Sequence, residues 1–554
     1  MTPEELSTTI VAALTALVDR GAVALPDGVP AQVVVERPKN KDHGDYATNV
    51  ALQLAKKAGL PPRDIANLLA EELGAANGIA RVDIAGPGFL NITVEAGAQG
   101  LVAAQVVQAG RTYGHGAQLS GSHFNVEFIS ANPTGPLHLG HTRWAAVGDA
   151  IARVLAAAGA QVAREFYIND RGNQMNLFGA SIEAAALGNP IPEDGYQGGY
   201  IVDLASQIVT KQPDIVDLPA EERVVAFREA GYELQLKEQQ EQLETFHTHF
   251  DMWFSERTLH ESGAVEHGLD VLQSNGHLFE DDGALWLRTT DFGDDKDRVL
   301  RRSNGELTYF ASDTAYYVNK RERGFDVCVY LLGADHHGYI GRLKAMAACA
   351  GDDPERNIEI PIGQLVKIMK GGEEVRLSKR AGNIVTLGEL VDMIGVDALR
   401  YSLVRYPADS PLTLDVEQIT KASSDNPVYY VQYAHARLSA ILRNAQDLGI
   451  EPSVESFDPA LLSHEREGDL LRALAEFPRV VAGAAQLREP HRVARYLEDT
   501  ASTFHKFYDV CRVLPQGDEE PGDLHRARLL LVQATRTVFA NGLDLLGVTA
   551  PERM

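Results

Sequence analysis

The chain has few cysteines, and this scarcity excludes several classes of protein. Its 554 residues contain only three, too few and too widely spaced for a disulfide framework or a cysteine-rich zinc site: Cys328, Cys349 and Cys511. A chain that does not depend on disulfides suits a reducing compartment. We therefore expect a cytoplasmic protein.

Long hydrophobic runs are also missing. A membrane-spanning helix needs about 20 consecutive apolar residues. The most apolar stretch, residues 144–160, is interrupted by Asp149 and Arg153. We therefore expect a water-soluble protein with no membrane partner.

Positive charge is in deficit as well. The chain carries 51 lysines and arginines against 77 aspartates and glutamates, a net charge of −26. Such a surface repels polyanions as a whole, so a nucleic-acid partner could bind only at a local basic patch. The rest of the composition is ordinary for a globular protein, since 45% of residues are hydrophobic and 23% are charged. We expect the chain to fold throughout, into about three or four domains.

The hydrophobic periodicity divides the chain into three parts. Residues 1–115 are expected to form an α+β N-terminal domain, which ends where three glycines interrupt the pattern. Helices are expected near residues 1–20, 48–58 and 63–73, with strands at 33–36 and a strand pair within 81–94.

Residues 116–390 alternate strands and helices, which is typical of a Rossmann-type α/β domain with a parallel sheet. Residues 180–262 are acidic and helical, so we interpret them as a helical insertion in this domain. Strand signals stop after about residue 390, and amphipathic helices follow one another from residue 421. Residues 391–554 are therefore predicted to form an all-α C-terminal helical bundle.

The strongest local motif is HLGH, residues 138–141, which follows a strand and a loop rich in proline and glycine and opens a helix. A helix N-terminus offers backbone N–H groups and the positive end of its dipole to an anion. His138 and His141 face the same way and can donate ring N–H groups to phosphate oxygens, while Gly140 allows a flat base to approach closely. The motif predicts a triphosphate site. Taken alone, it is equally compatible with two histidines that only cap a helix.

A second motif, VRLSKRAGN, covers residues 375–383 and follows a pair of glycines. Its Ser378, Lys379 and Arg380 would form a cationic lid over a polyphosphate, able to stabilise charge on the α-phosphate and the departing pyrophosphate. Taken alone, the motif fits a solvated basic surface loop better.

The two motifs flank the same expected sheet, so both should lie at its carboxyl edge. This pairing resembles the class I aminoacyl-tRNA synthetases, whose signature sequences are an HIGH-type tetrapeptide and a KMSKS-type loop. Here these read HLGH and RLSKR, with Arg376 and Leu377 in place of the first lysine and the methionine. The serine and the second lysine are retained as Ser378 and Lys379.

The resemblance extends essentially from end to end to the arginyl-tRNA synthetase family. It is carried by ERPKNKDHGDYATNVAL, VEFISANPTGPLHLGH, YINDRGNQ, LTYFASDTAYYVNKRERGFD, YLLGADHHGY and VDALRYSLVRYPADSPLTLD. It implies an arginine–tRNA ligase, with an N-terminal domain that touches the tRNA elbow and a bundle that reads the anticodon of tRNA(Arg). It also implies a monomer in which activation of L-arginine waits for bound tRNA.

A pocket for arginine must recognise a planar, permanently charged guanidinium, which requires a carboxylate and preferably an aromatic or hydroxyl neighbour. Tyr309 and Asp313 lie four residues apart at the start of an expected helix, on one face. The resemblance assigns this pair to the arginine side chain, whereas the residues alone would suggest a helix cap and a surface tyrosine. It also places Glu127, Ser130 and Asn132 near the amino and carboxyl groups of the substrate.

The resemblance further places a carboxylate against the ribose of the adenylate. Here this is Asp335, which follows Gly333 at the end of a strand, and both are assigned to ATP. The adjacent His336 is assigned to arginine. Because the family varies at this point, which of Asp335 and His336 contacts ribose or arginine stays open.

The expected reaction uses ATP as a substrate, with Mg²⁺ bridging its phosphates. Catalysis is by positioning and charge stabilisation through His138, His141 and Lys379, with no protein nucleophile and no metal ligands from the protein. A pocket built around a guanidinium leaves a buried carboxylate unpaired when lysine or citrulline enters, so no editing domain is needed. The insertion would also be too short for one.

Three other functions are weighed against this reading. A nucleotidyltransferase shares the HxGH chemistry but is usually a single short domain, and a cysteinyl-type synthetase would need zinc-binding cysteines. A tRNA-binding paralogue without activity is disfavoured because both signature motifs are intact. Tyr429, Tyr430 and Tyr433 are candidates for stacking on tRNA bases, although tyrosines at such spacing are at least as often buried.

Overall fold

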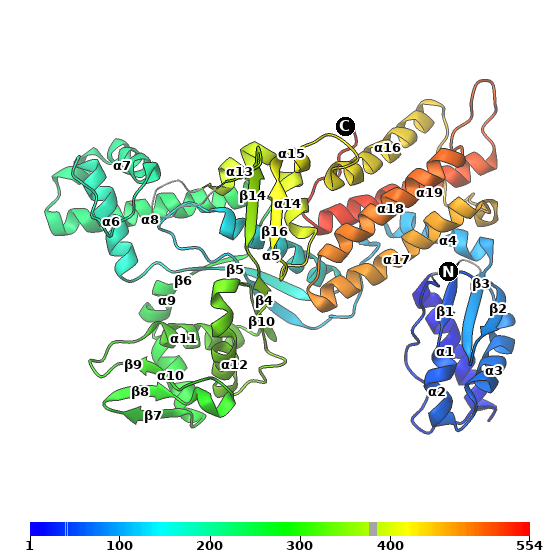
Figure 1. Ribbon diagram of the computed structural model, residues 1–554, viewed down its shortest axis with the longest axis horizontal. Coiled ribbons are helices and arrows are strands. Elements are labelled where there is room, and N and C mark those ends of the chain that lie inside the picture. Colours follow the sequence, from blue (N-terminus) through cyan, green and yellow to red (C-terminus); the bar gives the residue numbers. More distant parts are fainter. Residues whose placement is uncertain (39, 41–42, 376–384) are drawn as a thin grey trace.

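The computed structural model describes residues 1–38, 40, 43–375 and 385–554. In Figure 1 the N-terminal domain lies beneath the C-terminal helices, and the central sheet separates these from a helical projection on the opposite side. Helices and strands are named below as in that figure.

The N-terminal domain has its own core and a three-stranded antiparallel sheet in the order β1-β3-β2. Its elements are α1 (Pro3–Asp19), β1 (Tyr46–Thr48), α2 (Val50–Ala58), α3 (Pro62–Gly74), β2 (Ile79–Ala85) and β3 (Phe89–Val94). The predicted strand at 33–36 is wrong, since in this stretch only Glu36 pairs, through a single bridge to Ala47. Three consecutive valines suit a strand by propensity, but propensity alone does not supply a pairing partner.

The following helix, α4 (Ala96–Ala109), packs against helices of the C-terminal bundle. Its buried Val102, Ala103 and Val106 belong to the large core shared by the central sheet and the bundle. The chain between β3 and the central sheet is therefore built into the main body.

The central sheet is parallel, with five strands in the order β12-β10-β4-β5-β6. They are β4 (His123–Glu127), β5 (Gln161–Ile168), β6 (Met252–Ser255), β10 (Val327–Tyr330) and β12 (Ile358–Glu359). The chain runs outward from β4 through β5 to β6 and then crosses to β10 on the other side of β4. The carboxyl ends of β4 and β10 therefore border the crevice where α/β proteins bind ligands. This arrangement confirms the predicted Rossmann-type architecture.

Two structures are added to this sheet. The helical insertion comprises α6 (Asn173–Ala186), α7 (Gly199–Lys211) and α8 (Ala220–Thr245), which form the projection in Figure 1. It ends earlier than the predicted residue 262, because Met252–Ser255 returns to the central sheet as β6. An antiparallel sheet that the sequence did not predict follows: β7 (Leu278–Asp281), β8 (Ala284–Leu287) and β9 (Arg298–Arg301).

Further helices and short strands complete the central region. The helices are α5 (Leu139–Ala157), α9 (Glu256–Glu261), α10 (Ala264–Ser274), α11 (Tyr309–Glu322), α12 (Ile340–Cys349), α13 (Leu387–Ile394), α14 (Val396–Val404) and α15 (Val416–Ile419). The strands are β11 (Leu332–Gly333), β13 (Ile362–Gly363), β14 (Val366–Lys370), β15 (Glu373–Glu374) and β16 (Leu412–Asp415). The expectation that strands stop after residue 390 is wrong for β16, which is only four residues long and pairs with β14.

The C-terminal helices confirm the predicted bundle. They are α16 (Pro427–Asp447), α17 (Glu465–Leu487), α18 (His491–Val510) and α19 (Asp523–Leu545). Among the described residues, no helix is long and apolar enough to cross a membrane.

One buried arginine joins the central domain to the end of the bundle. Arg400 on α14 donates to the Asp149 carboxylate on α5 at 2.6 Å, to the Phe246 carbonyl at 2.8 Å and to the Leu546 carbonyl at 3.1 Å. Its side chain is fully buried. A charge removed from water must be this completely paired, so the contact fixes α5, α14 and the end of α19 relative to one another.

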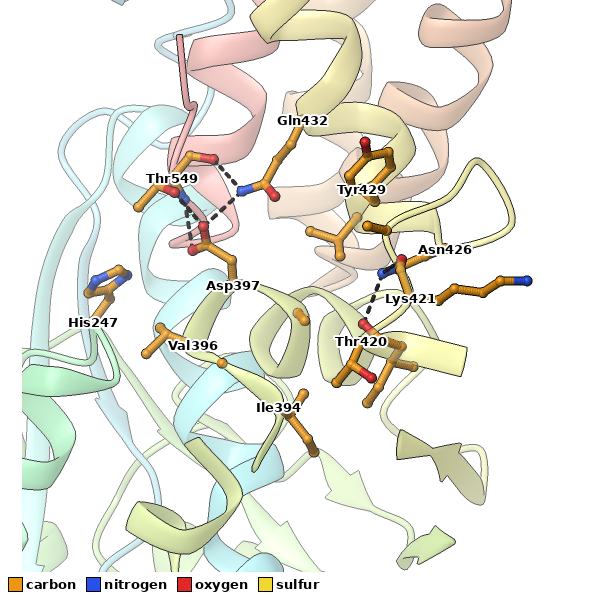
Figure 2. Close-up of a pocket in the computed structure, with 15 residues that line it drawn as sticks. His247, Ile394, Val396, Asp397, Thr420, Lys421, Asn426, Tyr429, Gln432 and Thr549 are labelled. Carbon is orange, nitrogen blue, oxygen red and sulfur yellow. Dashed lines mark hydrogen bonds between the residues drawn. The ribbon is translucent and has the colours of Figure 1, made fainter. Parts of the chain in front are cut away.

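A cavity of about 440 Å³ lies beside this joint, between α14, α16 and the C-terminal tail (Figure 2). Its polar groups bond one another: Asp397 accepts from the Gln432 amide at 2.7 Å and from the Thr549 backbone N–H at 3.0 Å. The cavity is thus part of the contact between the domains, and it does not include the HLGH residues.

Candidate active site

The HLGH motif forms the first turn of α5. His138 is the N-cap residue, and its Nδ1 accepts a hydrogen bond from the Gly140 backbone N–H at 3.1 Å. The His138 backbone N–H donates to Nδ1 of His141 at 3.3 Å, and the two rings lie 3.9 Å apart between centroids. The two histidines therefore do cap the helix, as one of the sequence interpretations proposed.

This capping also sets the tautomer of both rings. Because each Nδ1 is an acceptor, each neutral ring carries its proton on Nε2. Nε2–H is the donor that a phosphate oxygen would need, so helix capping and phosphate binding are compatible in the same residues. The backbone N–H of Gly140, which the sequence offered as a free donor, is occupied by the His138 ring.

Gly140 has a steric role that the sequence did not suggest. A Cβ atom at this position would lie 3.0 Å from Cε1 and 3.2 Å from Nδ1 of His138. Any side chain would therefore press on the imidazole ring that caps the helix. Gly140 itself is exposed at the surface of this turn.

The chain beyond the second motif returns to the first. Thr386 forms an antiparallel bridge with His138, and the Leu387 N–H donates to the Leu137 carbonyl at 2.8 Å. Thr386 also caps α13 through a capping box with Glu389. Ser378, Lys379 and Arg380 lie outside the described residues.

The carboxyl end of β10 carries the predicted ribose-binding segment. Gly333 ends β11, and Asp335 and His336 follow it in a short 3₁₀ turn. The side chains of Asp335 and His336 are 81% and 50% exposed and lie 3.5 Å apart. β10 and β4 are direct neighbours in the sheet, so these residues and those that follow β4 border the same crevice.

Asp313 lies one turn into α11 in an acidic environment. Burial, followed by the charges of Glu256 and Glu127, raises the pKa of the Asp313 carboxyl to about 7, against a smaller opposite effect of Arg342. Burial also raises the pKa of Glu256, whose carboxylate interacts with the Tyr167 hydroxyl. Three carboxyl groups, of which Asp313 becomes ionised only near pH 7, form a site that a guanidinium would stabilise.

Tyr309 begins α11, one turn before Asp313, and its side chain is 73% exposed. Its hydroxyl reaches toward the loop after β5, where a Cβ on Gly172 would lie 3.8 Å from it. Tyr309 thus lies at the surface, one helix turn from Asp313 and close to the loop that contains Gly172. Tyr309 and Asp313 therefore lie on one face of α11, with Asp313 toward the protein interior and Tyr309 at the surface.

The residues after β4 are held by side-chain hydrogen bonds. The Ser130 hydroxyl donates to the Glu127 carboxylate at 3.1 Å and accepts from the Tyr167 backbone N–H at 3.1 Å. Asn132 is exposed, two residues farther along. Ser130 thus connects the end of β4 to the end of β5.

A buried charge network lies next to these carboxyl groups. Lys320 has a fully buried side chain, contacts Glu127 at 2.5 Å, and lies over the rings of Tyr316 and Tyr330 at 4.3 and 3.9 Å. On β5, Glu165 accepts from the Tyr316 hydroxyl at 2.6 Å and from Arg323 at 2.8 and 2.9 Å. Burial disfavours the charged form of Glu165, but these bonds lower its pKa.

Sequence reasoning missed two members of this site, Glu256 and Lys320. Glu256 was included in the predicted insertion, although it directly follows strand β6 of the central sheet. Recognising FDMWFS as a strand of the parallel sheet would have placed Glu256 at the carboxyl edge. Lys320 shows no local signal, because its partner Glu127 lies 193 residues away.

A parallel sheet with its crevice between β4 and β10, an HLGH turn at the start of α5 and a chain that pairs with this turn just after the second motif define a class I tRNA synthetase. Three family models match this chain: the arginyl tRNA synthetase N terminal domain over residues 4–94, the class I (R) tRNA synthetase catalytic domain over residues 105–404, and the DALR anticodon binding domain over residues 431–554. The matches cover each part of the described architecture.

Comparison with similar proteins identifies the family within this class. The arginine–tRNA ligase of Renibacterium salmoninarum is 60% identical over all of both chains, and that of Frankia alni is 57% identical over all of both chains. The arginyl-tRNA synthetase structure from Thermus thermophilus, 24% identical, aligns over the full length of both chains with a TM-score of 0.74 and thus shares the fold. The chain belongs to the arginine–tRNA ligase family.

Proposed function

We propose that this chain joins arginine to tRNA(Arg) in the crevice at the carboxyl ends of β4 and β10. In the first step a carboxylate oxygen of arginine attacks the α-phosphorus of ATP, the bond to pyrophosphate breaks, and arginyl-adenylate forms. In the second step a hydroxyl of the terminal tRNA ribose attacks the arginyl carbonyl, and AMP leaves. Membership of the family, together with the return of the chain from the second motif to His138, carries this proposal.

The phosphates of ATP are assigned to the start of α5 and the second motif. His138 and His141 donate through Nε2–H, as their capping bonds allow, and Gly140 keeps the turn open. Ser378, Lys379 and Arg380 supply positive charge to the α-phosphate and the pyrophosphate. Magnesium accompanies ATP as part of the substrate and neutralises phosphate charge. The donors assigned here are N–H groups and cations, which suit phosphate oxygens more than they suit a metal ion.

Adenosine is assigned to the residues that follow β10. The Gly333 backbone leaves room for the nucleoside, and the exposed Asp335 carboxylate accepts from the ribose hydroxyls. His336, beside it, faces the bound arginine. Support for this comes from the position of these residues at the strand neighbouring β4.

The arginine side chain is assigned to the acidic pocket. Asp313 and Glu256 accept from the guanidinium and Tyr309 covers it from the surface, while Glu127 is balanced by Lys320. The substrate amino and carboxyl groups are assigned to the residues that follow β4: Glu127, Ser130 and Asn132. Two carboxyl groups whose pKa values stay raised, despite the smaller opposite effects of Arg342 and Arg171, are what distinguishes arginine from neutral analogues.

We assign tRNA contacts to the terminal domains, in keeping with a division into residues 1–115, 116–390 and 391–554. On α16, Tyr433 is 39% exposed and stacks near Tyr429, with ring centroids 6.0 Å apart, and Arg437 lies over the Tyr508 ring at 4.4 Å. Exposed aromatic rings beside a guanidinium suit unstacked bases. The chain acts as a cytoplasmic monomer, and size-exclusion chromatography with light scattering tests that state.

Pyrophosphate exchange measured with each amino acid, with and without total tRNA, tests the proposed activity. We expect exchange only with arginine, and only when tRNA is added. Exchange with another amino acid would overturn the specificity, and equal exchange without tRNA would overturn the dependence on tRNA.

A further inference from the structure

The helical insertion holds the loop that connects β4 to the HLGH turn. Gln239 on α8 donates from its Nε2 to the carbonyl oxygens of Asn132, at 3.1 Å, and Gly135, at 2.8 Å. Tyr200 on α7 donates from its hydroxyl to the carbonyl of Thr134 at 3.0 Å. Two helices of the insertion therefore bind three carbonyl groups within four residues of this loop.

The start of the same loop has an unfavourable backbone conformation. Ile129 and Ser130 have φ angles of 68° and 42°, in the left-handed region that glycine tolerates and a β-branched residue rarely adopts. The Ser130 N–H donates to the Phe128 carbonyl at 2.9 Å, which closes a tight turn at the end of β4. Such a backbone persists only where the surrounding structure holds it, and it is often found at functional sites.

Gln239 is suited to this task by its chemistry. Its side chain is fully buried, and the amide nitrogen has two hydrogens, one for each of two carbonyls. Packing alone does not require these bonds. Gln235, one turn earlier on α8, is equally buried, but its amide donates to Glu238 of the same helix at 3.0 Å.

We propose that Gln239 is a positioning residue for the ligase reaction. It acts through the backbone of residues 131–137 and fixes the places of Asn132 and His138, so the helical insertion is part of the active-site scaffold. The inference rests on the proposed placement of these two residues in the site. Because loss of an ordered position for groups that bind reactants lowers the rate, release of the loop should reduce activity even when the fold persists.

The test compares Gln239→Met with Gln235→Met, which removes an equally buried amide from the same helix. Both variants are assayed by tRNA-dependent pyrophosphate exchange, after titration of active sites, and their thermal midpoints are measured. We expect kcat/KM for ATP and for arginine to fall at least tenfold in Gln239→Met, about 1.4 kcal/mol of transition-state stabilisation, and to stay within twofold in Gln235→Met. The KM for tRNA should stay within twofold in both. Equal losses in the two variants, or wild-type kinetics in Gln239→Met, would overturn the proposal.

Gln239→Glu is a second test that preserves side-chain length, in case the methionine variant folds poorly. A glutamate carboxyl can donate at most one hydrogen bond, so at least one of the two carbonyls loses its donor. A loss of activity is therefore expected, and full activity would overturn the role. Asn132→Ala separates this role from the site assignment. If activity is lost in Asn132→Ala but kept in the Gln239 variants, the positioning role of Gln239 is refuted. If activity is kept in Asn132→Ala but lost in the Gln239 variants, positioning through His138 is supported and the proposed role of Asn132 is refuted.

Discussion

Thr386 pairs with His138 across an antiparallel bridge, so the chain that leaves the second signature motif is attached to the first residue of the HLGH turn. The motifs are more than 230 residues apart, yet the described residue Thr386 lies only two positions beyond residue 384. Along the chain, Thr386 follows Lys379 by only seven residues.

Lys379→Ala should slow adenylate formation. A preorganised donor to a charge that develops in the transition state contributes about 3 to 4 kcal/mol, or roughly 10² to 10³ in kcat. Single-turnover formation of arginyl-adenylate in the presence of tRNA measures the step. Lys367→Ala, an exposed lysine on β14, serves as the control and should be unchanged. Near-normal adenylate formation in Lys379→Ala would remove this residue from the mechanism.

Gly140→Ala should damage the phosphate site with little effect on arginine binding. The new methyl group would lie 3.0 Å from the His138 ring, which must shift by a few tenths of an ångström and thereby weaken its capping bond. We expect kcat to fall about tenfold, equivalent to about 1.4 kcal/mol. Steady-state exchange kinetics give kcat and both KM values. Gly97→Ala on α4, where a Cβ meets no atom within 4 Å, is the control. Unchanged kcat in Gly140→Ala would contradict the steric argument.

Asp313→Asn should weaken arginine binding and reduce the discrimination against citrulline. Truncating one charge of a buried pair costs about 2 to 5 kcal/mol, so KM for arginine should rise at least about 30-fold. Competition between arginine and citrulline in the exchange assay measures both effects. Glu322→Gln, at the far end of the same helix, is the matched control. The pocket assignment fails if the asparagine variant keeps its preference for arginine.

Arginine binding should depend on pH through Asp313. Its pKa is raised to about 7 in the free protein by burial and by Glu256 and Glu127, whereas a bound guanidinium favours the charged carboxylate. Binding must therefore release a proton below pH 7. The affinity for arginine should fall up to about tenfold for each unit by which the pH drops below 7, and it should level off above pH 7. The same raised pKa means that the unliganded fold loses stability as pH rises from about 4 to 7. Calorimetry in buffers of different ionisation enthalpy counts the released proton; no release at pH 6 would exclude this linkage.

Lys320→Met should destabilise the catalytic domain. The substitution leaves the Glu127 carboxylate, which has a 12% exposed side chain, without its cation, at a cost of about 3 to 5 kcal/mol. Thermal unfolding should show a clear drop, part of which the double variant Lys320→Met/Glu127→Gln recovers. Lys57→Met, which breaks the exposed pair with Asp27, should cost less than about 1 kcal/mol. Equal effects of the two single substitutions would contradict this account.

The structural elements that could be predicted from the sequence are those that depend on local residue patterns. The strand, loop and helix around HLGH and the four long C-terminal helices each follow from a continuous pattern of apolar and capping residues, and the structure confirms them. Some pairings depend on strands far along the chain, as for the two-residue strand β12 and for β14 with β16. The register of these pairs could not be predicted from the sequence. The separate β7–β9 sheet is different: β7 and β8 form a local hairpin joined by Asp282 and Gly283, a turn signal that the sequence analysis did not use.

The residues of the candidate site also divide into those that a local motif reveals and those that depend on distant parts of the chain. His138, Gly140 and Asp313 stand in recognisable motifs, so they could be named from the sequence. Glu256 was missed, because its place near Asp313 depends on recognising β6 as the edge strand of the parallel sheet. Gln239 lies in a helix of even polar character, and only its two bonds to distant carbonyls distinguish it from Gln235.

The single arginine shared by α5, α14 and the last residues of α19 limits how the protein can be recombined. A graft that replaced the bundle with that of a distant relative would have to import α14 together with the tail after Leu545, or leave Arg400 buried opposite a tail that does not match it. The natural crossover point for such hybrids therefore lies before residue 396, well upstream of the first long bundle helix.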